Sequence, residues 1–151
     1  MSDLSELYQE LILDHNRRPK NFGVLEHPDR QAHGHNPLCG DRWTVALGLH
    51  DGLIADIAFT GAGCAISKAS ASLMTEAVRG RTVDDALRLV ERFHDVLTGP
   101  VDDAATDDEI GKLSVFRGVR EFPMRVKCAT LAWHTLKAAL LQADAPVVKI
   151  E

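Results

Sequence analysis

The feature that most constrains the fold is a pair of alternating apolar and polar segments on either side of Asp51-Gly52. Before this dipeptide, from about Trp43 to His50, every second residue is a large apolar one, which is the pattern of a half-buried strand. The segment after it places four apolar residues on one expected face: Leu53, Ala55, Ile57 and Phe59. Asp-Gly is the two-residue turn signal of a tight hairpin. The sequence therefore predicts an antiparallel hairpin.

Helical patterns surround this hairpin. Apolar residues at helical spacing predict an N-terminal helix around Leu4, Leu7, Tyr8, Leu11 and Ile12. Further helices are predicted over residues 65–78, from a cap at Thr82 to Gly99, and from Pro123 to about Gln142. A short helix before Gly118 and a short edge strand over residues 29–35 complete the pattern. The last long helix is expected to place near one face Met124, Cys128, Leu131, Thr135 and Ala139.

Strands that precede most of the helices indicate an α+β fold, with a small antiparallel sheet of about three strands and helices packed on it. A chain of 151 residues suits one domain with its own core, so we expect a single domain over residues 1–151. Residues 100–109 are rich in acidic side chains and are expected to form a solvated loop. The tail after Ala143 is expected to be frayed.

Composition excludes several classes of function. The net charge of −5 argues against nucleic-acid binding through phosphate neutralisation. No apolar run approaches the roughly 20 residues needed to span a bilayer, and the N-terminus lacks the pattern of a secretory signal. Three cysteines make a disulfide framework improbable. We therefore expect metal ligation or thiol chemistry in the cytoplasm, without nucleic-acid or membrane partners.

The cysteines lie where the predicted elements begin and end. Cys39 precedes the first hairpin strand, two positions before Asp41, and Cys64 follows the second strand at the start of a helix. Free amide groups at a helix N-terminus stabilise a thiolate. In an antiparallel hairpin the start of the first strand and the end of the second lie side by side, which brings Cys39 and Cys64 together. If the last helix packs against the same edge, Cys128 joins them. Three thiolates and one carboxylate suit tetrahedral Zn²⁺.

Other interpretations of these residues remain open. Cys128, taken alone, is equally a small buried apolar side chain. Gly61 and Gly63 before Cys64 could suggest a phosphate loop, but the lysine and the full glycine spacing of nucleotide motifs are absent. His33 and His35 precede Cys39 and could ligate a metal, although loop histidines are more often only hydrogen-bonded.

Three ordered blocks of the sequence resemble the signature blocks of the IscU/NifU/SufU iron–sulfur cluster assembly proteins. They are Asn36-Pro37-Leu38-Cys39-Gly40-Asp41, Gly61-Ala62-Gly63-Cys64-Ala65-Ile66-Ser67-Lys68-Ala69-Ser70, and Arg125-Val126-Lys127-Cys128-Ala129. Two features are similar to the SufU branch in particular. Lys127 stands where IscU proteins have a histidine, and residues 100–122 look like the extra insertion of SufU proteins.

The resemblance implies an IscU/SufU-like fold and a zinc-dependent sulfurtransferase. Such an enzyme accepts persulfide sulfur from a PLP-dependent cysteine desulfurase of the SufS type and passes it to a downstream cluster assembly scaffold. The matching positions make Cys39 the sulfur acceptor and a zinc ligand, together with Asp41, Cys64 and Cys128. The alternative is a scaffold on which an iron–sulfur cluster is transiently assembled; a purely structural zinc module is a third.

Three thiolates and a carboxylate carry more negative charge than Zn²⁺ neutralises, so nearby cations are expected to matter. The candidates are Lys68, Arg125 and Lys127, each of which could equally be an ordinary surface charge.

Overall fold

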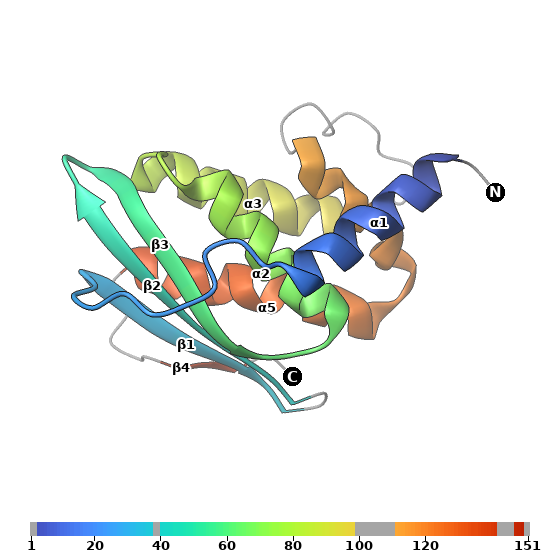
Figure 1. Ribbon diagram of the computed structural model, residues 1–151, viewed down its shortest axis with the longest axis horizontal. Helices are drawn as coiled ribbons and strands as arrows, with labels where there is room; N and C mark the ends of the chain where they lie inside the picture. The colour runs from blue at the N-terminus through green and yellow to red at the C-terminus, as the bar shows by residue number, and fades with distance from the viewer. Residues whose placement is uncertain (1–2, 38–39, 99–110, 142–146, 150–151) are drawn as a thin grey trace.

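The computed structural model describes residues 3–37, 40–98, 111–141 and 147–149. In chain order (Figure 1), the elements are α1 (Asp3–Arg17), β1 (Arg30–Asn36), β2 (Asp41–His50), β3 (Leu53–Ala62), α2 (Ala65–Val78), α3 (Val83–Thr98), the 3₁₀ helix η1 (Gly111–Glu121), α5 (Pro123–Leu140) and β4 (Val147–Lys149). The predicted short helix near Gly118 is thus η1, which continues past that glycine. The acidic segment 100–109, expected to be a loop, lies outside the described residues.

The sheet has the strand order β3-β2-β1-β4. The first three strands are antiparallel neighbours, as the alternating pattern predicts, whereas β4 runs parallel to β1. The expectation of a frayed tail is therefore wrong for Val147–Lys149, which pairs with residues 33–35. An unpaired strand edge carries free backbone donors and acceptors, and a short strand from the tail satisfies those of β1.

The hairpin turn has the geometry that its sequence demands. Asp51 and Gly52 both adopt positive φ, at 53° and 80°, as a type I′ turn requires. The residues of β3 that point to the core, however, are not all those that simple alternation predicts. The pairing with β2 shifts at Ala55, so Ile54 turns into the core and is 0% exposed, while Leu53 is 40% exposed. A bulge inserts one extra residue and reverses the side-chain alternation beyond it.

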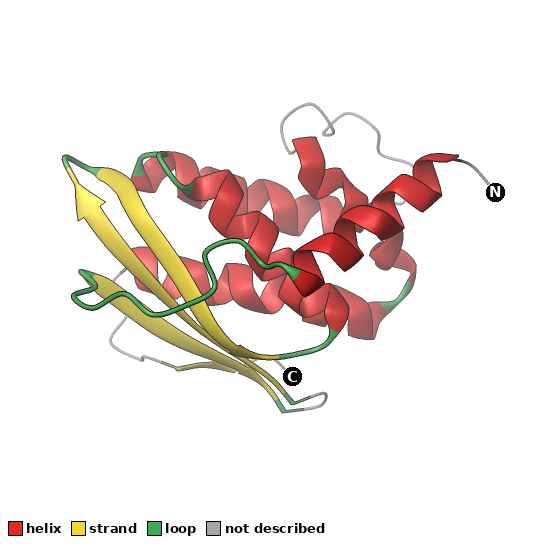
Figure 2. Ribbon diagram, in the orientation of Figure 1, coloured by secondary structure: helices red, strands yellow, loops and turns green. Residues whose placement is uncertain are grey.

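All the long helices lie on one face of the sheet (Figure 2). Helix α5 packs directly on β1 and β2. A Cβ on Gly34 of β1 would lie 1.9 Å from Thr135 Oγ1, so only glycine allows this approach. Cys128, Leu131, Thr135 and Ala139 are buried, as expected for one face of the helix, but Met124 is 46% exposed because it lies in the first turn, beyond the sheet. The close packing of α5 determines where Cys128 sits.

A pair of histidines lies between α3 and α5. The rings of His94 and His134 meet edge to face with their centroids 5.5 Å apart, and Lys137 forms an ion pair with Glu91 beside them. Burial lowers the pKa of His134, and the charges of His94 and Lys137 lower it further, against the opposing effect of Glu91. The folded protein therefore protonates this imidazole less readily than the unfolded chain does.

We expect the free energy of unfolding to fall as the pH drops through the ordinary histidine pKa of about 6.5 and to keep falling towards the lowered pKa of the folded state. Urea unfolding at several pH values measures this dependence. His134→Gln should flatten it, because the variant removes the proton-binding difference. His27→Gln, which changes an exposed histidine, is the matched control. Identical pH dependences for His134→Gln and the unmodified protein would contradict the prediction.

Candidate metal centre

Three side chains from three elements converge at one end of the sheet. They are Asp41 at the start of β2, Cys64 at the start of α2 and Cys128 on α5, and their donor atoms all lie within 4.8 Å of one another. Figure 1 shows the end of β3, the start of α2 and the start of α5 gathered at this end of the molecule. The predicted convergence is confirmed for these three residues. Cys39 lies outside the described residues, so its place in the site stays a prediction.

Asp41 carries the clearest sign that a cation belongs here. Its side chain is 1% exposed, and Oδ1 accepts a hydrogen bond of 3.0 Å from the backbone N–H of Cys64. The other oxygen, Oδ2, is buried without a hydrogen-bond partner among the described residues. Burying a carboxylate oxygen without a partner is costly, and a metal ion would satisfy it. Two sulfur ligands of a tetrahedral zinc lie about 3.8 Å apart, which is compatible with this donor group.

Cys64 is the N-cap of α2. Its Sγ accepts a hydrogen bond from the backbone N–H of Ser67 at 3.4 Å, and its backbone is extended, with φ −68° and ψ 170°. The N-terminal end of a helix carries unpaired N–H groups and partial positive charge. The residue is exposed, whereas Cys128 is buried at 7% exposure. The site therefore has one accessible thiol and one enclosed thiol among its described members.

Hydrogen bonds from two tryptophans hold the helices that carry these thiols. Trp43 Nε1 donates to Ser67 Oγ at 2.7 Å, which ties β2 to the first turn of α2. Trp133 Nε1 donates to Ser70 Oγ at 3.0 Å, and Ser70 Oγ donates to the carbonyl of Ala129 at 2.5 Å, which ties α2 to α5. The sequence shows these serines only as small residues in a helix. Nothing local indicated that they position the cysteines.

Gly63 leaves the space into which Asp41 fits. A Cβ at this position would lie 2.7 Å from Trp43 Cζ2 and 3.0 Å from Asp41 Oδ1. Trp43 is 1% exposed and cannot move away, so an added methyl group must displace the carboxylate.

We expect Gly63→Ala to weaken zinc binding by about tenfold or more, as changes next to metal ligands do. Competition with a chromophoric chelator measures this affinity. Gly118→Ala is the matched control, because a Cβ there meets nothing within 4 Å. Equal zinc affinities for the two variants would show that Gly63 has no part in shaping the site.

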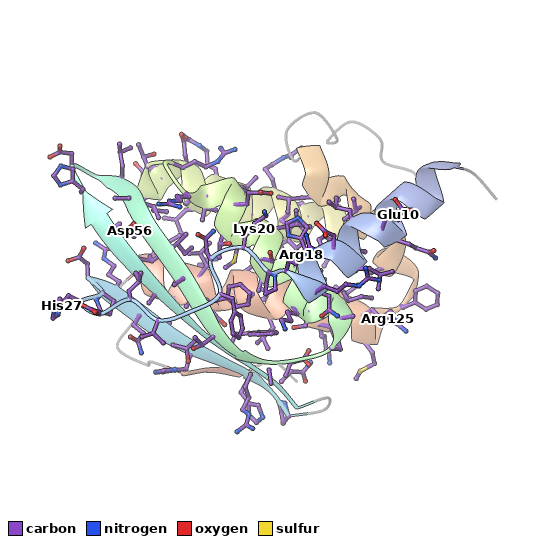
Figure 3. The ribbon with its side chains drawn as sticks, in the orientation of Figure 1. Glu10, Arg18, Lys20, His27, Asp56 and Arg125 are labelled. Carbon is purple, nitrogen blue, oxygen red and sulfur yellow. The ribbon has the colours of Figure 1, made fainter. Side chains whose placement is uncertain are left out.

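The remaining residues singled out in the sequence lie elsewhere. Among the described residues, Asp41, Cys64 and Cys128 make the one group of three potential metal donors, so His33 and His35 do not join it. The Nζ atom of Lys68 lies over the ring of Phe22, 5.2 Å from its centroid. Lys127 is half-buried and Arg125 is exposed, and Figure 3 shows Arg125 at the end of the molecule where α5 begins. The three cations therefore stay candidates for balancing the charge of the site.

Comparisons with known proteins place the chain in a family. The NifU-like N terminal domain family matches residues 7–129. The chain is 37% identical over 143 residues to the zinc-dependent sulfurtransferase SufU of Bacillus subtilis, a match that covers 95% of each chain. It is 39% identical over 140 residues to the iron–sulfur cluster assembly scaffold protein IscU of Streptococcus pyogenes, covering 93% of this chain and 86% of that protein.

A crystal structure from Fervidobacterium islandicum, assigned as a cluster assembly scaffold of the SUF system, has a similar fold. Its TM-score is 0.81 at 35% identity, and the alignment covers 89% of this chain and 97% of that one. Among the described residues, no helix is both long and apolar enough to cross a membrane. The chain therefore belongs to the NifU-like N-terminal domain family, within the group of IscU, NifU and SufU iron–sulfur cluster assembly proteins.

Proposed function

We propose that this protein is a zinc-dependent sulfurtransferase that accepts sulfur from a cysteine desulfurase of the SufS type and delivers it to iron–sulfur cluster assembly. The observation that carries the proposal is the unpartnered Oδ2 of buried Asp41, which lies in one donor group with Cys64 and Cys128. Support for the sulfurtransferase activity comes from the Bacillus subtilis relative, which is named for it.

In this proposal, zinc is held by Asp41, Cys64, Cys128 and Cys39. Chain connectivity supports Cys39 as the fourth ligand, because Asn36 and Asp41 are register partners and residues 37–40 join them. Cys39 is two positions from Asp41, so their Cα atoms are at most about 7.6 Å apart. The backbone N–H of Gly40 donates to the carbonyl of Asn36 at 2.8 Å, which brings the two ends of this connection together.

Zinc would keep the thiols deprotonated at neutral pH without redox chemistry of its own. The transfer itself belongs to Cys39. Its thiolate attacks the outer sulfur of the persulfide on the donor enzyme, a new S–S bond forms on Cys39, and the old S–S bond breaks to release the donor cysteine as a thiolate. Electrons balance within this exchange, so no external oxidant or reductant is needed.

The two described thiols are held by helices, which supports the proposed roles. Cys128 is buried on a helix that packs against the sheet, and Cys64 is fixed as the cap of α2, so both suit permanent ligands. Cys39 follows Pro37 and precedes Gly40, which adopts a φ of +78° that only glycine takes up readily. By sequence, Cys39 thus belongs to the connection between two strands, and binding residues are disproportionately found on such connections.

The second candidate is a scaffold that carries a transient iron–sulfur cluster on the same ligands. The relative from Streptococcus pyogenes, named as a scaffold, favours it. The sequence resemblance counts against it, because Lys127 stands where IscU-type scaffolds are expected to have a histidine.

Elemental analysis after aerobic purification separates the two functions. A sulfurtransferase should retain close to one zinc per chain and no chromophore, and it should stimulate the cysteine-dependent turnover of a SufS-type desulfurase. A labile brown chromophore containing iron and sulfide, without any stimulation of the desulfurase, would favour the scaffold and overturn the proposal.

A further inference from the structure

Among the described residues, no helix covers the face of the sheet opposite α2 and α5 (Figure 2). A cavity of about 340 Å³ lies on this face, lined by His33, Gly34, His35, Arg42, Trp43, Thr44 and Gly61. We call this cavity the outer groove. Its residues come from three strands. Two of them, His33 and His35, have side chains that can bind a metal, but they do not belong to the donor group of the metal centre.

The pairing of the strands explains the shape of the outer groove. Gly34, Trp43 and Gly61 are register partners across β1, β2 and β3. The side chain of Trp43 is buried in the core and the two glycines have none, so this row offers only backbone to the outer face. Side chains alternate between the two faces along a strand. The neighbouring residues in each strand therefore point to the outer face, and their side chains form the two walls of the groove.

The walls carry hydrogen-bond donors. The first wall consists of His33, Thr44 and Thr60, which are paired across β1, β2 and β3. The second wall contains His35 and Arg42, which are paired across β1 and β2. His33 Nδ1 and Thr44 Oγ1 lie 2.7 Å apart, and this hydrogen bond fixes the imidazole. A histidine offers an N–H donor even when neutral, and the guanidinium of Arg42 offers several in a planar fork.

The outer groove continues beneath the loop that precedes β1. A second cavity of about 260 Å³ shares His33 and Thr44 with it and is closed on one side by Gly23, Val24 and Leu25. None of the described residues that line either cavity is acidic, although the whole chain has a net charge of −5. An acid-free concavity with Arg42 in its wall favours a negatively charged occupant.

We propose that the outer groove binds a small, multiply charged oxyanion, such as a phosphate or the carboxylates of a small organic acid. An Arg fork accepts two oxygens of such a group side by side, and the threonine hydroxyls and histidine N–H groups can satisfy the others. A second metal site is the competing interpretation, because two histidines at alternate positions of a strand share one face. It is disfavoured because no third donor joins them among the described residues and Arg42 lies next to His35.

The proposal is tested on the full-length, zinc-loaded protein by NMR, with inorganic phosphate and citrate as probes at constant ionic strength. We expect saturable shifts of the amides of residues 33–35, 42–44 and 60–61. Arg42→Gln should raise the dissociation constant about tenfold, since it removes a charge-assisted pair of hydrogen bonds. Arg88→Gln, which changes an exposed arginine on α3, is the matched control and should bind as the unmodified protein does.

The comparison of probes identifies the source of the oxygens: tighter binding of phosphate indicates a phosphorylated ligand, and tighter binding of citrate a carboxylic acid. Thr44→Val provides a second variant if Arg42→Gln does not fold, and it should also weaken binding. The proposal is overturned if neither probe gives saturable shifts or if Arg88→Gln weakens binding as much as Arg42→Gln. A second equivalent of zinc that binds here and is lost in His33→Gln would overturn it in favour of a metal site.

Discussion

Removing zinc with a strong chelator should lower the melting temperature of this protein by about 10 °C or more. Three of the proposed ligands lie on β2, at the N-cap of α2 and on α5, so the metal ties together elements that are far apart in the sequence. Binding energy at such a site is largely folding energy. For a chain of this size each kcal/mol lost lowers the melting temperature by about 2–4 °C, so the loss of about 4 kcal/mol produces the expected shift. Differential scanning calorimetry measures it.

Cys128→Val is the sharper version of this experiment. The variant keeps a buried apolar side chain of similar size but removes one ligand, and it should lose most of its zinc together with stability. Val78→Ala, a change in the core away from the site, should lose stability but keep its zinc. If Cys128→Val retained full zinc content and its melting temperature, Cys128 would be an ordinary core residue.

Cys39→Ala should bind zinc yet accept no sulfur. The three remaining donors already lie together in the folded chain and can hold the metal, with water at the vacant position. The variant has no thiolate to attack the donor persulfide, so sulfur uptake and stimulation of the desulfurase should fall by at least about a hundredfold, as expected when the nucleophile is removed. Mass spectrometry after incubation with desulfurase and cysteine measures the added sulfur.

The unmodified protein supplies the control for that experiment. After peptide mapping, one added sulfur should be found on Cys39. Cys39→Ser, which preserves the size of the side chain, should fail in the same way as Cys39→Ala while keeping its zinc. Sulfur found on Cys64 or Cys128, with Cys39 unmodified, would contradict the assigned acceptor.

The sequence alone determined the parts of this protein that depend on local patterns. Alternation from Trp43 and the Asp51-Gly52 turn specify the hairpin, because strand periodicity and turn conformation are properties of neighbouring residues. Antiparallel pairing then brings the start of β2 and the end of β3 together, which is why the meeting of Asp41 and Cys64 could be predicted. The position of Cys128 next to these two residues was harder to predict. Helical periodicity shows which face of α5 the residue lies on, but not which other element packs against that face.

Tertiary structure alone decided the rest. The bulge at Ala55 moved Ile54 into the core, and the pairing of β4 with β1 joined segments more than a hundred residues apart. The unpartnered oxygen of Asp41 and the outer groove likewise appear only when strands are aligned in register. Register and burial arise from contacts between distant segments, whose energies compete across the whole molecule, so no local pattern encodes them. The sequence determined which residues have the chemistry to act, and the packing of α2 and α5 on the sheet decided which of them meet.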